Sequence, residues 1–168
     1  MKKLVFASLG LFLCSVLFVT SVFAAEKIAC VDLGRIFSEY VKTKDYDKTL
    51  GAKQTSYDTE RDKKVTEIKQ FQDKMNLLSD KEKEAKKAEL ETKIKALQEF
   101  DRAKQTDLRK ELSEKKSELI KDIEGAIKQY AEKEGYTLVL TEAGLAYNAK
   151  KLDITEKILG ILNKNYKR

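Results

Sequence analysis

The apolar positions between residues 36 and 134 recur every three or four residues, in a stretch otherwise dominated by Lys, Glu, Asp, Gln and Ala. The apolar stripe occupies only about two positions in seven, which is typical of a coiled-coil seam and narrower than the face of a helix on a globular core. The chain contains no Pro, so nothing forces a long helix to break. We assign to the seam Val65, Ile68, Phe71 with Gln72, Met75, Leu78, Leu90, Ile94, Leu97, Leu108, Leu112, Leu119, Ile123 and Ile127.

The periodic pattern lapses between Leu78 and Leu90, and a helix-start signal lies at the beginning of the gap. In the sequence Ser-Asp-Lys-Glu, Ser79 can accept from the amide three residues on, and Glu82 can bond the Ser79 amide, which forms a capping box. We therefore predict a turn near residues 78–80 and two antiparallel helices. One continuous helix is the alternative, because this motif is common in charged helices. Arms of about 40 residues would project on the order of 60 Å.

Short β-branched and apolar segments flank the helical region and predict a small sheet. Up to three strands are expected, at Ile28–Asp32, Tyr136–Thr141 and Leu145–Tyr147, with a hairpin turn at Glu142–Gly144 before the third. Asp153 and Glu156 form a second capping-box candidate, which would open a helix with Ile154, Ile158, Ile161 and Leu162 on one side. About forty residues of sheet and helix are too few for a stable core of their own, so we expect an oligomer.

Three tyrosines, Tyr40, Tyr46 and Tyr57, lie with Leu50 near the start of the first arm at similar seam positions. They fit two interpretations. Their rings can fill a wider seam at the root of the hairpin, or they can form an adhesive surface for a bound protein.

The N-terminus has the pattern of a secretory signal peptide. Lys2 and Lys3 precede an apolar run, and Val22-Phe23-Ala24 offers a cleavage site before Ala25. We predict a cleaved signal peptide over residues 1–24, with a retained membrane anchor as the alternative. Cleavage would remove Cys14 and leave Cys30 as the only thiol, so no intrachain disulfide could form. Cys30 lies in an apolar segment, and we interpret it as a small hydrophobic side chain that is buried. A role in dimerisation or in redox chemistry is the alternative.

The composition argues against enzyme chemistry. Without His, the usual triad base and the commonest metal ligand are missing. The chain also lacks a Gly-rich phosphate loop and a Cys-x-x-Cys pair. We therefore expect no enzyme, no catalytic or metal-binding residue and no cofactor.

The charge is unevenly distributed. The chain holds 34 Lys and Arg against 28 Asp and Glu. Residues 36–135 are almost balanced, at 24 against 23, whereas residues 136–168 hold six against three. A nucleic-acid binder would cluster its cations among aromatic residues, and here cations and anions alternate along the helices. We expect no nucleic-acid partner.

Motifs at both ends resemble the Skp/OmpH family of periplasmic chaperones for outer-membrane proteins. Near the N-terminus the similarity rests on Lys27-Ile28-Ala29-x-Val31-x-x-Gly34-x-x-Phe37. Toward the C-terminus it rests on Leu138-Val139-Leu140, Ala146-Tyr147-Asn148 and Asp153-Ile154-Thr155, in the order that the family has them. Together the motifs cover about thirty residues, and the signal peptide, charged helical insert and length agree with them.

The resemblance implies an α+β, mainly α, fold and a homotrimer. A long antiparallel helical-hairpin (coiled-coil) tentacle, residues 36–135, would stand on a small β-barrel trimerisation body formed by residues 25–35 and 136–168. The tentacles would enclose a cavity that holds unfolded outer-membrane β-barrel proteins in the periplasm without ATP. Contacts with these clients would be diffuse over the inner tentacle faces, and contact with a membrane surface stays open. By matching position, the body would include Ile28, Val31, Leu138, Val139, Leu140, Ala146 and Tyr147.

A coiled-coil spacer that organises the cell envelope without chaperone activity is the alternative. Such a spacer would use the hairpin tips to tether partners, and it would not suppress the aggregation of an unfolded protein.

Overall fold

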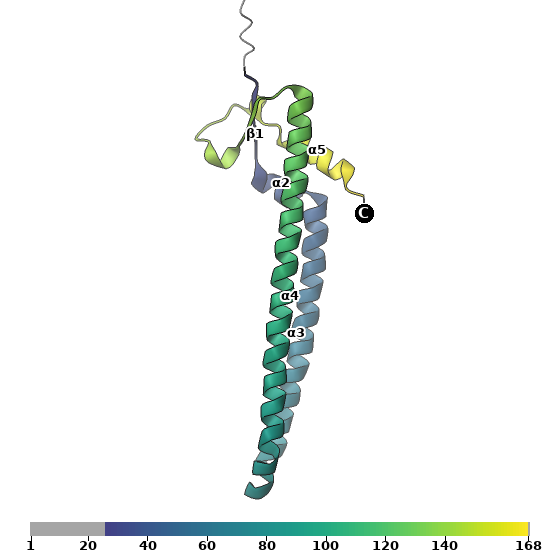
Figure 1. Ribbon diagram of the computed structural model, residues 1–168, viewed down its shortest axis with the longest axis vertical. Coiled ribbons are helices and arrows are strands. Elements are labelled where there is room, and N and C mark those ends of the chain that lie inside the picture. The colour runs from purple at the N-terminus through teal and green to yellow at the C-terminus, as the bar shows by residue number, and fades with distance from the viewer. Residues whose placement is uncertain (1–25, 168) are drawn as a thin grey trace, which may run out of the picture.

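A computed structural model describes residues 26–167, and the predicted signal peptide lies outside them. Two long antiparallel helices, α3 (Val41–Asn76) and α4 (Asp80–Glu134), form a rod, and the short elements gather at one end of it (Figure 1). These short elements are β1 (Ile28–Val31), α2 (Leu33–Glu39), β2 (Leu138–Thr141), the 3-10 helices η1 (Glu142–Gly144) and η2 (Lys150–Leu152), and α5 (Thr155–Asn165). The predicted fold class, a mainly helical hairpin with a small β-containing end, is confirmed.

The sheet has two parallel strands among the described residues, with Ile28 opposite Leu138 and Val31 opposite Thr141. The predicted third strand at residues 145–147 is wrong, and so is the hairpin turn before it. Residues 142–144 form η1, closed by a bond from the Leu145 amide to the Glu142 carbonyl at 2.9 Å, so the chain leaves the sheet instead of folding back on β2. The outer edge of β1 is partly covered, because the Ile154 amide donates to the Cys30 carbonyl at 3.0 Å.

The arms of the hairpin meet at a short turn, residues 77–79, followed by a capped helix start. The Ser79 amide donates to Glu82 Oε2 at 3.0 Å, and the Ser79 hydroxyl donates to the same oxygen. These bonds satisfy the amide at the start of α4. The hydrogen bond from the Ser79 hydroxyl, followed by the one from the Ser79 amide, lowers the pKa of the Glu82 carboxyl. At its other end α4 stops at Gly135, whose φ of 71° is a left-handed conformation that favours glycine.

The predicted capping box at the start of α5 is wrong. Asp153 Oδ1 accepts from the Thr155 amide at 2.8 Å, but Glu156 does not return to the Asp153 amide. That amide closes the η2 turn by donating to the Lys150 carbonyl at 3.2 Å, and the Glu156 carboxylate binds Arg35. The helix start is therefore held by a tertiary ion pair and by Thr155, whose hydroxyl accepts from the Asp32 amide at 2.9 Å.

The hydrophobic core lies at the end that holds the sheet. It joins β1, the α2 region, the last four turns of α4 and α5, and includes the fully enclosed Ile36 and Ile158. We call residues 26–40 and 119–167 the base, and residues 41–118 the projection. The base therefore extends into the segment that the sequence assigned to the tentacle, because Ile36, Leu119 and Ile123 are core residues.

The projection has a seam and no core. Only Tyr57 is buried between residues 41 and 118, and the apolar seam positions from Val65 to Leu108 are half-buried. Leu112, which the periodicity places in the seam, is 56% exposed, so its assignment to the seam is wrong. A two-helix contact shields each seam residue on one side only, and the other side stays in water.

Candidate functional site

The described residues contain little that could support chemistry. Among residues 26–167, no group of three or more Cys, Asp or Glu side chains is arranged to hold a metal ion. Within the same range none of the helices combines the length and apolar character needed to span a bilayer.

The aromatic rings of the projection pack against other side chains and do not form an open adhesive surface. Tyr57 lies 5.7 Å from Phe100, measured between ring centroids, and its hydroxyl donates to Asp101 at 3.2 Å. Lys64 and Lys104 lie over the Phe100 ring, 5.2 and 5.5 Å from its centroid. The structure thus favours the packing interpretation of the tyrosines, since Tyr40 and Tyr57 are both buried.

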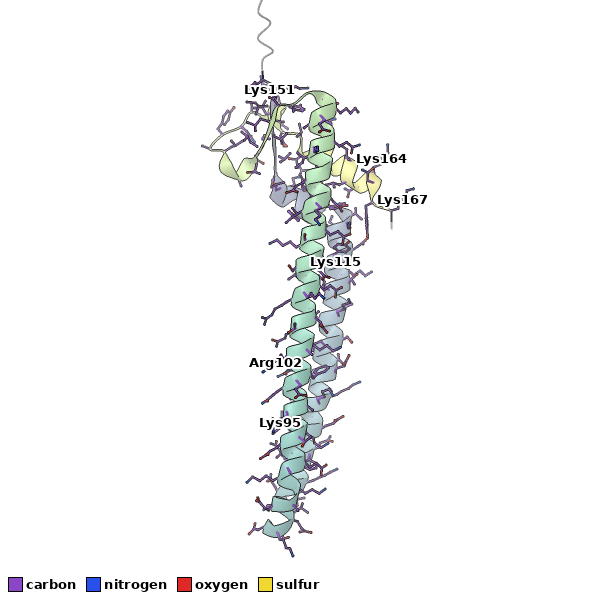
Figure 2. All side chains as sticks on the ribbon, viewed as in Figure 1. Lys95, Arg102, Lys115, Lys151, Lys164 and Lys167 are labelled. Carbon is purple, nitrogen blue, oxygen red and sulfur yellow. The ribbon has the colours of Figure 1, made fainter. Side chains whose placement is uncertain are left out.

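Ion pairs connect the two helices of the projection. Lys53 binds Glu111 at 2.6 Å, and Arg61 binds Asp101 at 3.3 Å. These two pairs have their cation on α3, whereas Glu60 of α3 faces Lys104 of α4 at 4.0 Å, with the cation on the other arm. Figure 2 shows charged side chains along the whole rod. The surface of the projection is therefore polar, and residues 41–118 hold 21 Lys and Arg against 18 Asp and Glu.

A charged cluster at the junction of base and projection was not found from the sequence. Lys42 lies within 2.6 Å of Glu118 and 2.7 Å of Asp122, and its side chain is only 12% exposed. Asp122 also accepts from the Tyr40 hydroxyl at 3.2 Å. Nothing local marks these residues, because Lys42 meets its partners only after the arms fold back with the correct register.

The pKa values at this cluster follow from its contacts. Hydrogen bonds from Lys42 and Tyr46 lower the pKa of Glu118 to about 2. Burial works to lower the pKa of Lys42, but hydrogen bonds to Asp122 and Glu118 outweigh it and the pKa is raised. Burial, with the adjacent Asp122, raises the pKa of Tyr40 to about 12. Lys42 and Glu118 therefore stay ionised at neutral pH while Tyr40 keeps its proton, and their contacts hold the first turn of α3 against α4.

Helix α5 also holds the start of the projection. The Val41 amide, at the beginning of α3, donates to Asn163 Oδ1 of α5 at 2.9 Å. Tyr166, just beyond α5, meets the Tyr40 ring edge-to-face with centroids 6.1 Å apart. The direction in which the projection leaves the base is thus set by contacts to residues more than 120 positions away in the sequence.

The residues that the family resemblance assigns to the trimer body fall into two groups according to their burial. Val31 is enclosed in the core, and Val139 and Leu140 are half-buried. The others carry apolar surface into water: Ile28 is 38% exposed, Leu138 is 46% exposed, Tyr147 is 85% exposed, and Ala146 is also exposed. Because Ile28 and Leu138 are paired across the strands, their exposed surfaces lie together on the sheet.

Cys30 is 2% exposed in β1. The Asn148 side chain donates to its sulfur at 3.1 Å. Burial raises the pKa of the Cys30 thiol, although the Asn148 hydrogen bond works in the opposite direction. A buried thiol with a raised pKa is a poor nucleophile, which agrees with the interpretation of Cys30 as a buried small hydrophobic residue.

Comparisons with known proteins agree with this architecture. The model of the family described as "Outer membrane protein (OmpH-like)" matches residues 27–162. Two proteins named Chaperone protein Skp are similar to the chain at 29% identity, one from Photorhabdus luminescens and one from Pectobacterium atrosepticum. Each comparison covers 95% of this chain and 98% of the relative.

A solved structure has a similar fold. It is described as an OmpH-like outer membrane chaperone of Caulobacter crescentus, and it superimposes with a TM-score of 0.77 at 14% identity. The superposition covers 84% of this chain and 86% of that one. At this identity the likeness concerns the fold. The family model matches residues 27–162, which is most of this chain, so the chain belongs to the OmpH-like outer membrane protein family.

Proposed function

We propose that this protein is a periplasmic holdase chaperone that binds unfolded outer-membrane β-barrel proteins and prevents their aggregation without ATP. Membership of the OmpH-like family and the name of the Skp relatives support this function. The observation that carries it is the projection, which is long, charged on its surface and weakly apolar along its seam. An outer-membrane strand alternates apolar and polar residues and offers unpaired edges in water, so a weakly apolar enclosure can block edge pairing and still release the chain.

The working form in this proposal is a homotrimer whose bases complete one another. The described base contributes only two strands, and the apolar surfaces of Ile28, Leu138 and Tyr147 face water. A two-stranded sheet is marginal by itself, and neighbouring copies would extend it and cover these side chains. Three projections would then surround a cavity, and clients would contact their inner faces.

Two measurements test the proposal. A urea-unfolded outer-membrane porin is diluted into buffer with and without the protein, and light scattering follows aggregation. Suppression at one trimer equivalent per porin is expected, and unsuppressed scattering would eliminate the chaperone function. Light scattering coupled to size exclusion gives the oligomeric state separately. A trimer mass is expected at micromolar concentration, and a monomer mass would refute the assembly.

A further inference from the structure

A groove on the base, at the contact between α4 and α5, combines positive charge with an apolar floor. It is a hollow of about 430 Å³. We call it the α4–α5 groove, and it is lined by Gln129, Tyr130, Lys133, Glu156, Lys157, Gly160, Ile161, Lys164 and Asn165. Figure 2 shows Lys164 on α5, which belongs to the base and lies at that end of the molecule. The groove is thus separate from the surface on which the proposed function places clients.

The lysines of the groove have no carboxylate partner among residues 26–167. Lys133, Lys157 and Lys164 are all exposed, and none lies within ion-pair distance of an acidic group. The one acidic side chain in the lining, Glu156, is bound by Arg35. Arg35 divides its single positive charge between Glu156 and Glu39, so the lining sets three lysines against one partly neutralised carboxylate. The groove therefore carries a share of the positive excess of residues 136–168, which hold six cations against three anions.

Helix stability accounts for only two of these lysines. Lys133 and Lys164 lie in the last turns of α4 and α5, where a cation interacts favourably with the helix dipole. Lys157 lies near the start of α5, where a cation is unfavourable. Its position beside the other two lysines adds positive charge to the groove at a cost to the helix.

The remaining lining residues match a polypeptide better than a phosphate group. Tyr130 and Ile161 are half-buried and give the groove an apolar floor. The amides of Gln129 and Asn165 are also in the lining, and each offers both a hydrogen-bond donor and an acceptor. A peptide backbone carries both kinds of group, whereas an ionised phosphate accepts only.

We propose that the α4–α5 groove binds an acidic polypeptide segment of a partner protein. Its carboxylates would pair with Lys133, Lys157 and Lys164, and an apolar side chain between them would lie on Tyr130 and Ile161. A membrane surface fits less well, because a flat array of headgroups would meet the lysines at the rim and leave the floor and the amides unused. This interaction is independent of client binding by the projection.

Fluorescence anisotropy of a labelled synthetic peptide with one Phe among Glu residues, which lacks the alternating pattern of a client strand, tests the proposal on the full chain. The K133Q/K157Q/K164Q variant is expected to bind this peptide about tenfold more weakly than the wild type, with binding that weakens as salt is added. A matched control, K69Q/K95Q/R102Q, removes three exposed cations from the projection and should bind like the wild type; Figure 2 labels Lys95 and Arg102 on the rod. The same peptide with Lys in place of every Glu should not bind.

Equal binding by the two triple variants, or no binding by the wild type, would overturn the proposal. Vesicles containing phosphatidylglycerol provide the membrane arm. If the wild type binds vesicles but not the peptide, and the groove variant loses vesicle binding, the lysines bind lipid. That result would reject a polypeptide partner. The substituted lysines are exposed, so unchanged thermal unfolding is expected. Ile161→Ser keeps all three lysines, and a loss of peptide affinity in this variant would identify the floor as part of the site.

Discussion

The base and the projection share helix α4, yet the same helix is packed in two different ways. In the base, Leu119, Ile123 and Ala126 are enclosed because β1, the α2 region and α5 surround them. In the projection, α4 has α3 as its only neighbour, and of all the residues from 41 to 118 only Tyr57 is buried. Burial along α4 is thus decided by what surrounds the helix, since the seam residues of both parts are the same kinds of aliphatic side chain.

This difference separates two tasks. A packed base supplies the stability and the surfaces for assembly, and it fixes the direction of the projection through Asp122, which binds Lys42, and through Asn163. A projection with half-buried seam residues has few contacts to lose, so it can open or bend at low cost in free energy. Such an arm can adapt to clients of many shapes, which is what the proposed holdase requires.

The largest expected effect contrasts one isoleucine in each region. Ile158 in α5 is fully enclosed, and Ile158→Ala should reduce the free energy of unfolding by about 2–5 kcal/mol. Ile94 is half-buried in the projection, and Ile94→Ala should cost about 1 kcal/mol, because water already reaches part of the side chain. Urea unfolding at matched protein concentration measures both. Equal losses would show that the two regions do not differ in packing.

The second contrast concerns lysines in ion pairs. Lys42→Met leaves Asp122 without its cation and Glu118 with Lys115 alone, at the junction with the base, and should cost about 1–3 kcal/mol. Lys53→Met removes an exposed pair with Glu111 in the projection and should cost no more than about 1 kcal/mol. Chemical denaturation compares the two variants. A greater loss of stability for Lys53→Met would contradict this prediction, because the exposed pair in the projection would then contribute more than the cluster at the junction.

The third prediction is a pH dependence that arises at the junction. The pKa of Glu118 is lowered from 4.5 to about 2 in the folded chain, so its ionised form stabilises the fold. This contribution is fully present above about pH 4.5 and is lost as the pH falls toward 2. Glu118→Gln should therefore flatten the stability profile over this range, measured by urea unfolding at a series of pH values. Glu111→Gln serves as the control, and an unchanged slope in Glu118→Gln would contradict the assignment.

The smallest effect is expected at the far end of the projection. Ser79→Ala removes the hydroxyl that binds Glu82 at the start of α4, and should reduce stability by about 0.5–1 kcal/mol. Amide hydrogen exchange should increase in the turns next to residues 77–79 and stay unchanged in the base. A change in exchange that reaches the base would mean that the two regions unfold as one unit.

The sequence predicted the elements whose causes are local. The seam period and the Ser79–Glu82 motif each act within a few residues, and the structure contains the helices and the break that they indicate. The failures have distant causes. Glu156 has the correct spacing for a capping box, but Arg35, 121 positions earlier, binds it. Leu112 has the correct period for the seam and is still exposed.

The candidate surfaces were predictable to different degrees. The long charged arms follow from periodicity and composition. The Lys42 cluster, the capping of α3 by Asn163 and the α4–α5 groove do not, because each joins residues of separate elements. Their side chains are ordinary for charged helices, and only the folded arrangement shows which of them meet and which stay without partners.

The central claim is that the base assembles and the projection binds, and a shortened hairpin tests it most directly. Ile68 and Leu97 line the same hollow between the arms, so a short Gly-Ser turn can join them after deletion of residues 69–96. The shortened protein should keep the oligomer mass of the full chain by light scattering after size exclusion. It should also fail to suppress the aggregation of a diluted unfolded porin that the full chain holds in solution. Full suppression by the shortened oligomer would contradict the account.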